Sequence, residues 1–387
     1  MELTQELIGR ARELAPRIAA RAEDADRRRA PPDESISELC DAGLMSILSP
    51  KRYGGHELHV DALVGVGREI AAACPSTGWV TAFYIGHNWI HSIFPQKSQE
   101  EVFADRPWQL MSGQIAPTAR ARRVSGGFEV EGRQPWSSGV THANWIMFSG
   151  LCATEGQDPL ALMFMIPRSQ VTVHDSWYVA GMRGTGSTDV SVESVFVPDY
   201  HSLPLADFMG GTHAGVDVHD SPLYKLPGPA VIYSEAMSVM AGIMSGATQS
   251  YVNHCQERVT SYTGDGVAEK AATHMRAGRA AATVDAVDDL VDSTVRSITA
   301  WDGRDPLSIR ERARLRMRAS LVTSMVCDSV NDLIHGAGGN AFRDEAPLQR
   351  YFRDINFLRT HAALDLDPTS EMYGRLMFGM DPGTPIV

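Results

Sequence analysis

Apolar side chains recur at helical spacing over the first hundred residues of the chain. Between residues 2 and 29 they lie three or four residues apart among Ala, Leu, Arg and Glu, as in an amphipathic helix. Pro31 and Pro32 end this segment, and helical spacing resumes at 60–73. The pattern predicts an N-terminal helical domain over residues 1–110.

The pattern changes between residues 111 and 203. Apolar residues there alternate with polar ones or form short runs, and Gly and Pro clusters separate the runs, as in antiparallel strands. Residues 204–230 are rich in Gly, His, Asp and Pro and predict a connector. Helical spacing returns over 231–387 in three or four long segments. Patterning alone therefore predicts an α+β fold.

Composition narrows the possible partners. The net charge is −12, so no basic surface favours nucleic acid or an anionic membrane. No apolar run reaches the roughly 20 residues that span a bilayer, and the charged N-terminus lacks a signal peptide's apolar segment. The five cysteines contain no Cys-x-x-Cys pair, which is typical of reduced thiols in a cytoplasmic protein.

Common catalytic and metal-binding motifs are missing from the sequence. His87 and His91 form a His-x-x-x-His pair, but no Glu lies between them and no third ligand stands out, so we expect no metal site. The chain has no Gly-x-Ser-x-Gly segment. The Gly-rich segment 181–187 lacks the Lys of a phosphate-binding loop, and no βαβ pattern follows it.

Three segments together carry a family resemblance. They are Gly181-Met182-Arg183-Gly184-Thr185-Gly186-Ser187, the segment Trp136-Ser137-Ser138, and Arg350 to Ala363 with its Arg353-Asp354 pair. The chain resembles the acyl-CoA dehydrogenase superfamily over essentially its whole length. The resemblance implies an N-terminal helical domain, a central β-barrel-like domain and a C-terminal four-helix bundle. We expect Arg353 and Asp354 to form an ion pair that fixes the last core helix.

One departure from that family favours a different chemistry. Many members carry a catalytic Glu eight residues after the Asp, whereas this chain has Ala362 there, preceded by His361. The loop Ala116-Pro117-Thr118 and the segment around Trp79 are similar to two-component, reduced-flavin-dependent monooxygenases. That subgroup implies hydroxylation of a phenolic or polycyclic aromatic substrate by O2 through a C4a-hydroperoxyflavin. A separate NAD(P)H-dependent flavin reductase would supply FMNH2 or FADH2, and the assembly would be a homotetramer.

The resemblance also assigns roles to individual residues. The catalytic residues would be His361, Ser138 and His87. His91, one turn after His87, is an alternative candidate for the role of His87. The flavin would be held by Trp136, Ser137, Ser138, Gln114, Arg258, Gly338 and Gly339, with Arg258 on the phosphate. The substrate would be contacted by His87, Trp79, Thr185 and Ser187. Further aromatic residues expected near the substrate are Phe83, Trp89, Trp177 and Tyr178.

Three other interpretations stay open on the sequence. The first is a flavin-dependent N-oxygenase of an amine or amino sugar, which shares the scaffold. The second is an acyl-CoA dehydrogenase with its base moved to Glu235 or Glu257. The third is a catalytically silent flavin- or ligand-binding protein that keeps only the fold.

Overall fold

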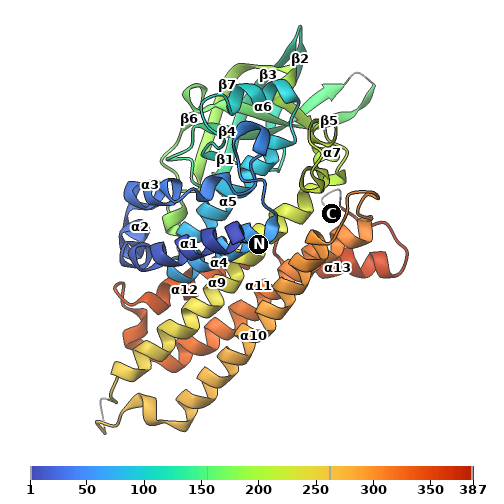
Figure 1. Cartoon of the computed structure of the whole chain (residues 1–387). Helices are drawn as coiled ribbons and strands as arrows, with labels where there is room; N and C mark the ends of the chain where they lie inside the picture. The colour runs from blue at the N-terminus through green and yellow to red at the C-terminus, as the bar shows by residue number, and fades with distance from the viewer. Residues whose placement is uncertain (1, 155, 261–262, 385–386) are drawn as a thin grey trace.

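The structure is a computed structural model that describes residues 2–154, 156–260, 263–384 and 387. In the N-terminal third, α1 packs on α4 and α4 packs on α5, which lies between the sheet and the long helix α9 Gly228–Glu257 (Figure 1). Apart from the partly exposed Phe83, every residue of α5 is buried, including polar residues such as Asn88 and His91. These helices are α1 Glu2–Ala20, α2 Ala22–Arg28, α3 Asp33–Asp41, α4 Val60–Ala73, α5 Pro75–Ser92 and α6 Gln96–Val102.

The middle of the chain forms one sheet at the end of the molecule opposite the tips of α9 and α10 (Figure 1). Its strand order is β6-β7-β3-β2-β4-β5-β8, and β1 pairs with β4. Alternating apolar residues of β3, β4, β5 and β7 fill a core of its own. The strands are β1 Met111–Gly113, β2 Ala119–Val124, β3 Gly127–Ser137, β4 Trp145–Thr154, β5 Gln157–Pro167, β6 Thr172–Val173, β7 Thr188–Pro198 and β8 Ser202–Pro204.

The predicted connector contains short regular elements. After β8 the chain forms α7 Leu205–Gly210 and α8 Gly215–Val218 before the long helices begin. The helix α9 Gly228–Glu257 is long and apolar enough to cross a membrane by length and composition. Since 83% of its most apolar stretch is buried inside the protein, α9 is the central core helix of the C-terminal half.

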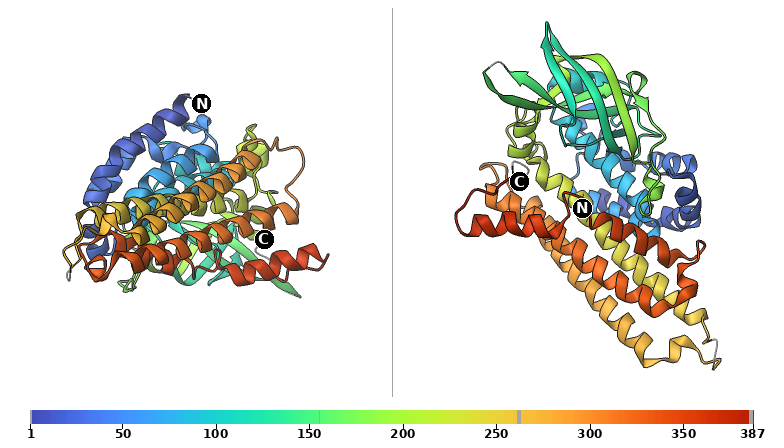
Figure 2. Two further views of the ribbon diagram at one scale, coloured as in Figure 1. Left: turned by 90° about the horizontal axis from the view of Figure 1, so that it is seen from below. Right: turned by 180° about the vertical axis from the view of Figure 1, so that it is seen from behind.

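The C-terminal helices extend away from the sheet, as the right view of Figure 2 shows. They share one hydrophobic core with the N-terminal helices, so α4 and α5 pack directly on α9. The helices after α9 are α10 Ala271–Thr299, α11 Ile309–Ala337, α12 Pro347–Leu358 and α13 Leu366–Met377. This arrangement confirms the predicted α+β fold with helical, sheet and helical parts in that order.

The last core helix is shorter than the sequence predicts. α12 ends at Leu358, and His361 lies in the turn that follows it. The Asp365 carboxylate caps α13 by accepting the Asp367 N–H at 3.2 Å, with Asp365 itself in an extended conformation. The segment between Leu358 and Asp365 is therefore not helical, and His361 lies within it.

Candidate active site

One stripe of α5 carries three aromatic side chains. Trp79, Phe83 and His87 are four residues apart and lie on one face of the helix. The ring centroids of Trp79 and Phe83 are 4.6 Å apart, and those of Phe83 and His87 are 5.3 Å apart. The His361 ring meets the edge of Trp79 at 5.7 Å from the other side. The sequence-predicted residues Trp79, His87 and His361 therefore belong to one cluster.

The hydrogen bond of His87 fixes its tautomer. Its Nδ1 lies 2.8 Å from the carbonyl oxygen of Met111 in β1. A carbonyl only accepts, so Nδ1 carries the hydrogen and Nε2 keeps its lone pair. Burial lowers the pKa of His87 to about 4, although the bond to Met111 works in the opposite direction. His87 is therefore neutral near pH 7 and presents a hydrogen-bond acceptor.

His361 presents a hydrogen-bond donor where His87 presents an acceptor. The backbone N–H of Ala363 donates to its Nδ1 at 3.2 Å, which leaves the hydrogen of the neutral ring on Nε2. Surrounding protein atoms lower the pKa of His361 to about 4, and the Arg316 guanidinium adds to this. The residue is also exposed to solvent, so water offsets part of that lowering. Arg316 of α11 also holds the turn itself by donating to the Ala362 carbonyl at 2.9 Å.

Trp136 stands out on the sheet side of the cluster. It sits in a β-bulge near the end of β3, has a φ of 66°, and leaves 51% of its surface exposed. A left-handed conformation is costly for a bulky residue and tends to persist at functional positions. Its ring contacts Trp177 at 5.5 Å and Phe357 of α12 at 5.8 Å. These contacts hold a half-exposed aromatic plate at the boundary between the sheet and the C-terminal helices.

Ser138 lies beside this plate and is linked to Trp79. The Trp79 indole N–H donates to the Ser138 hydroxyl at 3.3 Å. Behind it, the Ser187 hydroxyl lies 2.7 Å from Ser138 and 2.6 Å from the Thr185 hydroxyl. Thr185 and Ser187 are buried, so the structure places both behind Ser138. Direct substrate binding by these two residues stays a prediction that this arrangement does not support.

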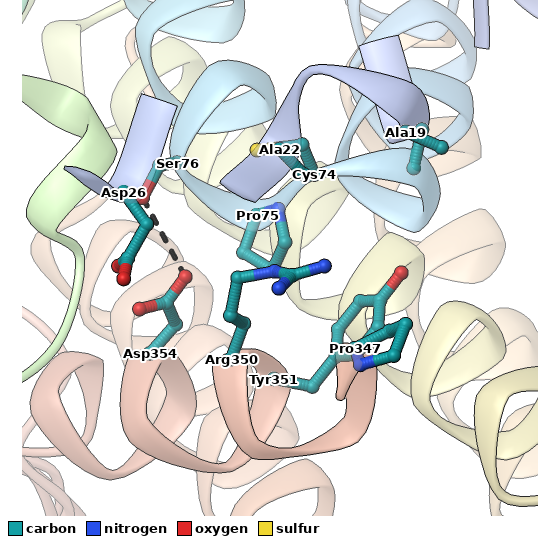
Figure 3. A pocket seen from close by; sticks show the side chains of 11 residues that line it. Ala19, Ala22, Asp26, Cys74, Pro75, Ser76, Pro347, Arg350, Tyr351 and Asp354 are labelled. Atoms are coloured by element: carbon teal, nitrogen blue, oxygen red, sulfur yellow. Dashed lines mark hydrogen bonds between the residues drawn. The ribbon is translucent and has the colours of Figure 1, made fainter. Parts of the chain in front are cut away.

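Asp354 ties the Gly181–Ser187 segment to α12. Its carboxylate accepts the Met182 N–H at 2.5 Å, and Figure 3 shows it beside Asp26 and Arg350 at a cavity of about 90 Å³. Burial raises the pKa of Asp354 to about 7. The expected Arg353–Asp354 ion pair is wrong, because Arg353 pairs instead with Asp26 at 3.0 Å. Consecutive helical residues point about 100° apart, which separates the two side chains.

Two buried polar atoms near β1 have no hydrogen-bond partner among the residues that the structure describes. They are the Ser112 hydroxyl oxygen and the Gln114 amide nitrogen. Unsatisfied buried groups are costly, and they are expected where a bound group completes the bonding. Together with the exposed Trp136 plate and the Ser138 hydroxyl, these atoms fit the ring of a flavin, which is planar, aromatic and rich in polar edges.

Arg258 and the predicted glycine turn meet at a distant place. Arg258 caps the far end of α9 and donates to the Ala337 carbonyl at 2.5 Å, while its guanidinium packs against Gly338. Glu235 contacts Gly86, next to His87, and lies 23 positions before Arg258 on the same helix. At 1.5 Å per residue the two ends are about 35 Å apart. Within one chain, Arg258 and Gly338 do not join the aromatic cluster.

Several other predicted residues lie in the protein interior or away from the cluster. Ser137 is fully buried and accepts from Gln134 at 3.4 Å. His91 packs on Phe94 and Phe103 and points at the Ser98 carbonyl, so it is structural. Trp89 is buried and donates to the Leu223 carbonyl, while Tyr178 is 69% exposed beside Arg29.

Neither carboxylate considered as a relocated base lies in the cluster. Glu235 is 1% exposed, burial raises its pKa well above the ordinary value, and one of its oxygens packs against Gly86. Glu257 lines a surface groove at the far end of α9. Because Glu235 is enclosed in the helix packing and Glu257 lies at the far end of α9, neither is placed to take a substrate proton, which disfavours the dehydrogenase interpretation.

Sequence reasoning missed four residues of the site: Arg316, Phe357, Ser112 and the anchoring role of Asp354. Arg316 reaches the site from α11 and its local sequence carries no signal, whereas Phe357 lies within the segment Arg350 to Ala363 but was given no role. Ser112 lies two residues before the predicted Gln114. Among the described residues, no group of three His, Cys, Asp or Glu side chains is arranged to hold a metal ion.

Comparison with known proteins decides the family. The model of the acyl-CoA dehydrogenase N-terminal domain matches residues 2–94, and that of the acyl-CoA dehydrogenase C-terminal domain matches residues 236–366. A "Pigment production hydroxylase" from Rhodococcus sp. (strain ATCC 21145) is 40% identical over the full length of both chains. The chain belongs to the acyl-CoA dehydrogenase family.

Further relatives place the chain within that family. The oxygenase component of an FADH2-dependent resorcinol hydroxylase from Rhizobium sp. (strain MTP-10005) is 30% identical, with 97% of this chain and 95% of that protein covered. The structure of XiaF from Streptomyces sp. in complex with FADH2 and glycerol superposes with a TM-score of 0.90, at 28% identity and coverage of 100% and 98%. The chain is an oxygenase component of a two-component, reduced-flavin-dependent monooxygenase.

Proposed function

We propose that this enzyme hydroxylates a phenolic ring held between His87 and His361. The observation that carries the proposal is the opposite hydrogen-bonding polarity of these two neutral histidines, which lie along one aromatic stripe. His87 offers an acceptor and His361 a donor. Trp79 and Phe83 supply apolar ring surface between them.

His87 would act as the general base. Its Nε2 takes the proton of the phenolic hydroxyl, and the ring then carries more electron density at the carbon to be hydroxylated. The Nδ1–H bond to the Met111 carbonyl holds the imidazole in place and stabilises the cation that forms. His361 would donate its Nε2 hydrogen to an oxygen atom at the reacting centre.

The flavin would lie against Trp136 with its polar edge toward Ser138 and Gln114. When bound in reduced form, it supplies the electrons that activate O2. The protein's part is to stack the ring, to accept a hydrogen bond at Ser138 and to satisfy the buried atoms of Ser112 and Gln114. Its phosphate would need a cation, and Arg258, which the resemblance assigns to the phosphate, lies about 35 Å from the cluster in the same chain.

We propose that Arg258 and the Gly338–Gly339 turn complete the flavin site of a neighbouring subunit in a homotetramer. The surface around Arg258 carries apolar side chains that are exposed in the single chain: Val259 at 62%, Met275 at 62% and Phe342 at 51%. A partner subunit that covers them would bring a guanidinium to a phosphate. We further propose a cytoplasmic enzyme supplied with reduced FMN or FAD by an NAD(P)H-dependent reductase.

The test is a single turnover with a His87→Asn variant. Asn retains a donor for the Met111 carbonyl but has no basic nitrogen. The rate at which hydroxylated phenol forms should therefore fall by about 100-fold or more. A phenol acidic enough to be ionised already at the assay pH should restore most of the rate. A variant that hydroxylates an ordinary phenol at the wild-type rate would exclude His87 as the base.

A further inference from the structure

We propose that Ser187 and Thr185 form a hydroxyl relay that fixes Ser138 as a hydrogen-bond acceptor, so that the site selects reduced over oxidised flavin. The inference rests on the proposed function, because it concerns the same flavin site. It assigns a role to two residues behind Ser138, which neither face the substrate nor touch the reacting atoms. They are positioning residues that act through Ser138.

The direction of the relay follows from one carbonyl group. The Thr185 hydroxyl lies 2.8 Å from the Met182 carbonyl oxygen, and a carbonyl only accepts, so the single hydrogen of Thr185 points there. Thr185 therefore accepts from Ser187 across 2.6 Å, and Ser187 accepts from Ser138 across 2.7 Å. The hydrogen of Ser138 points away from the flavin side.

Ser138 is left with acceptor capacity alone. Its hydroxyl already accepts the Trp79 indole N–H at 3.3 Å, and one lone pair remains. The N5 atom of a reduced flavin carries a hydrogen, whereas N5 of an oxidised flavin presents a lone pair. A serine that only accepts therefore stabilises the reduced form and opposes the oxidised form.

Burial keeps the relay from reversing. Thr185 is 1% exposed, Ser187 4% and Ser138 6%, so little water can supply alternative partners. The anchor is fixed as well. The Met182 N–H donates to Asp354, and its carbonyl also accepts the Trp177 indole N–H at 3.2 Å. Reversing the chain would leave two oxygen lone pairs facing one another at Met182 and Thr185.

The experiment measures the affinities of the full-length enzyme for reduced FMN and FAD, without oxygen, and for the oxidised forms. Ser187→Ala removes the acceptor for Ser138, and Thr185→Val frees Ser187 to donate to Ser138. In both variants Ser138 can turn its hydrogen toward N5. We expect oxidised flavin to bind better and the reduced-to-oxidised affinity ratio to fall by about tenfold. Ser187→Thr and Thr185→Ser retain the hydroxyls and should keep the wild-type ratio.

Each outcome separates the relay from the proposed function. An unchanged ratio in both Ser187→Ala and Thr185→Val, with normal thermal unfolding, overturns the relay and leaves the hydroxylase proposal intact. A wild type that binds reduced flavin without preference over oxidised flavin also overturns the relay. A wild type that binds neither form overturns the proposed function and the relay with it.

Discussion

At the scale of single residues, the site works through the positions of hydrogen atoms. His87 and His361 have the same side chain, yet Met111 and Ala363 give them opposite polarity. This difference lies in backbone groups that the sequence does not place. The motifs predicted that Ser138, His87 and His361 gather, but they also predicted residues such as Arg258 and Trp89 that lie elsewhere. They were not enough to predict what each side chain donates or accepts.

The low pKa of His87 leads to a prediction about pH. A base with a pKa of about 4 stays neutral down to that value, so kcat/KM for the phenol should not decline between pH 8 and pH 6. It should fall below about pH 5 as His87 becomes protonated. His87→Gln should lower the rate throughout and remove this acid limb. A wild-type profile that falls with an apparent pKa near 6.5 would contradict the assignment.

The lowered pKa of His87 also makes the stability of the folded protein depend on pH. The folded-state pKa of His87 is below its ordinary value of about 6.5, so between pH 4 and 6.5 the unfolded chain binds a proton that the folded chain does not. The contribution of His87 to stability is therefore fully present above about pH 6.5. It is lost as the pH falls toward 4.

Trp136 offers a second prediction at this scale. Because half of its surface is exposed, Trp136→Ala should change the free energy of unfolding by only about 1 kcal/mol. The same change should weaken the binding of reduced flavin by about tenfold or more, since the stacking surface is lost. Chemical unfolding and anaerobic titration measure the two effects. Unchanged flavin affinity would show that the ring does not stack on Trp136.

At the scale of elements, α12 joins the two halves of the site. Gly181 packs so closely on this helix that a Cβ atom there would lie 2.3 Å from the Arg353 carbonyl oxygen. Asp354 holds the next residue, Met182, in a left-handed conformation with a φ of 54°. The helix therefore sets the relay anchor on one side and His361 on the other.

Asp354 makes the contact between α12 and the Gly181–Ser187 segment dependent on pH. Its pKa is about 7 in the folded chain and about 3.9 in an unfolded chain, so between these values the folded state keeps a proton that the unfolded state releases. Stability should fall as the pH rises from about 4 through 7. The groups around the carboxylate are Asp26, Arg350, Arg353 and Cys74.

The variant Asp354→Asn tests this. The amide oxygen can still accept the Met182 N–H, but the side chain no longer ionises. Between pH 5 and pH 8 the wild type should lose more stability than the variant, by on the order of 1–3 kcal/mol. Urea unfolding at both pH values measures the difference. Equal losses in the two proteins would mean that Asp354 is ionised in the folded state throughout this range.

Elements were predictable to different degrees. Period-two runs located β3, β4, β5 and β7, because each strand buries one face. The end of α12 was not predictable, since the helical pattern of the sequence continues past Leu358, where the helix ends. The residue boundaries of the three domains stay a prediction.

At the scale of the whole molecule, the two parts of the proposed flavin site lie far apart in the single chain. The aromatic cluster lies near the sheet, and Arg258 lies at the other end of α9, about 35 Å away. The family resemblance suggested both parts and implied that Arg258 often acts across a subunit boundary; the distance along α9 comes from the structure. If Arg258 binds the flavin phosphate as proposed, the length of α9 means that a second subunit must supply it.

Mixing two inactive variants tests that requirement. Arg258→Ala and Trp136→Ala should each bind reduced flavin at least about tenfold more weakly. When the two are unfolded and refolded together, hybrid pairs should regain tight binding in about a quarter of all sites. Refolding each variant alone is the control. No recovery in hybrids of confirmed composition would place both residues outside a shared site.

The most direct test of the central claim is a single oxygen pulse. The wild-type enzyme is mixed without oxygen with reduced FMN or FAD and one of a panel of phenols, and hydroxylated product and hydrogen peroxide are then measured. We predict that at least one phenol yields hydroxylated product approaching one molecule per reduced flavin, with little peroxide. Peroxide alone with every phenol, together with reduction of bound oxidised FAD by an acyl-CoA, would contradict the account.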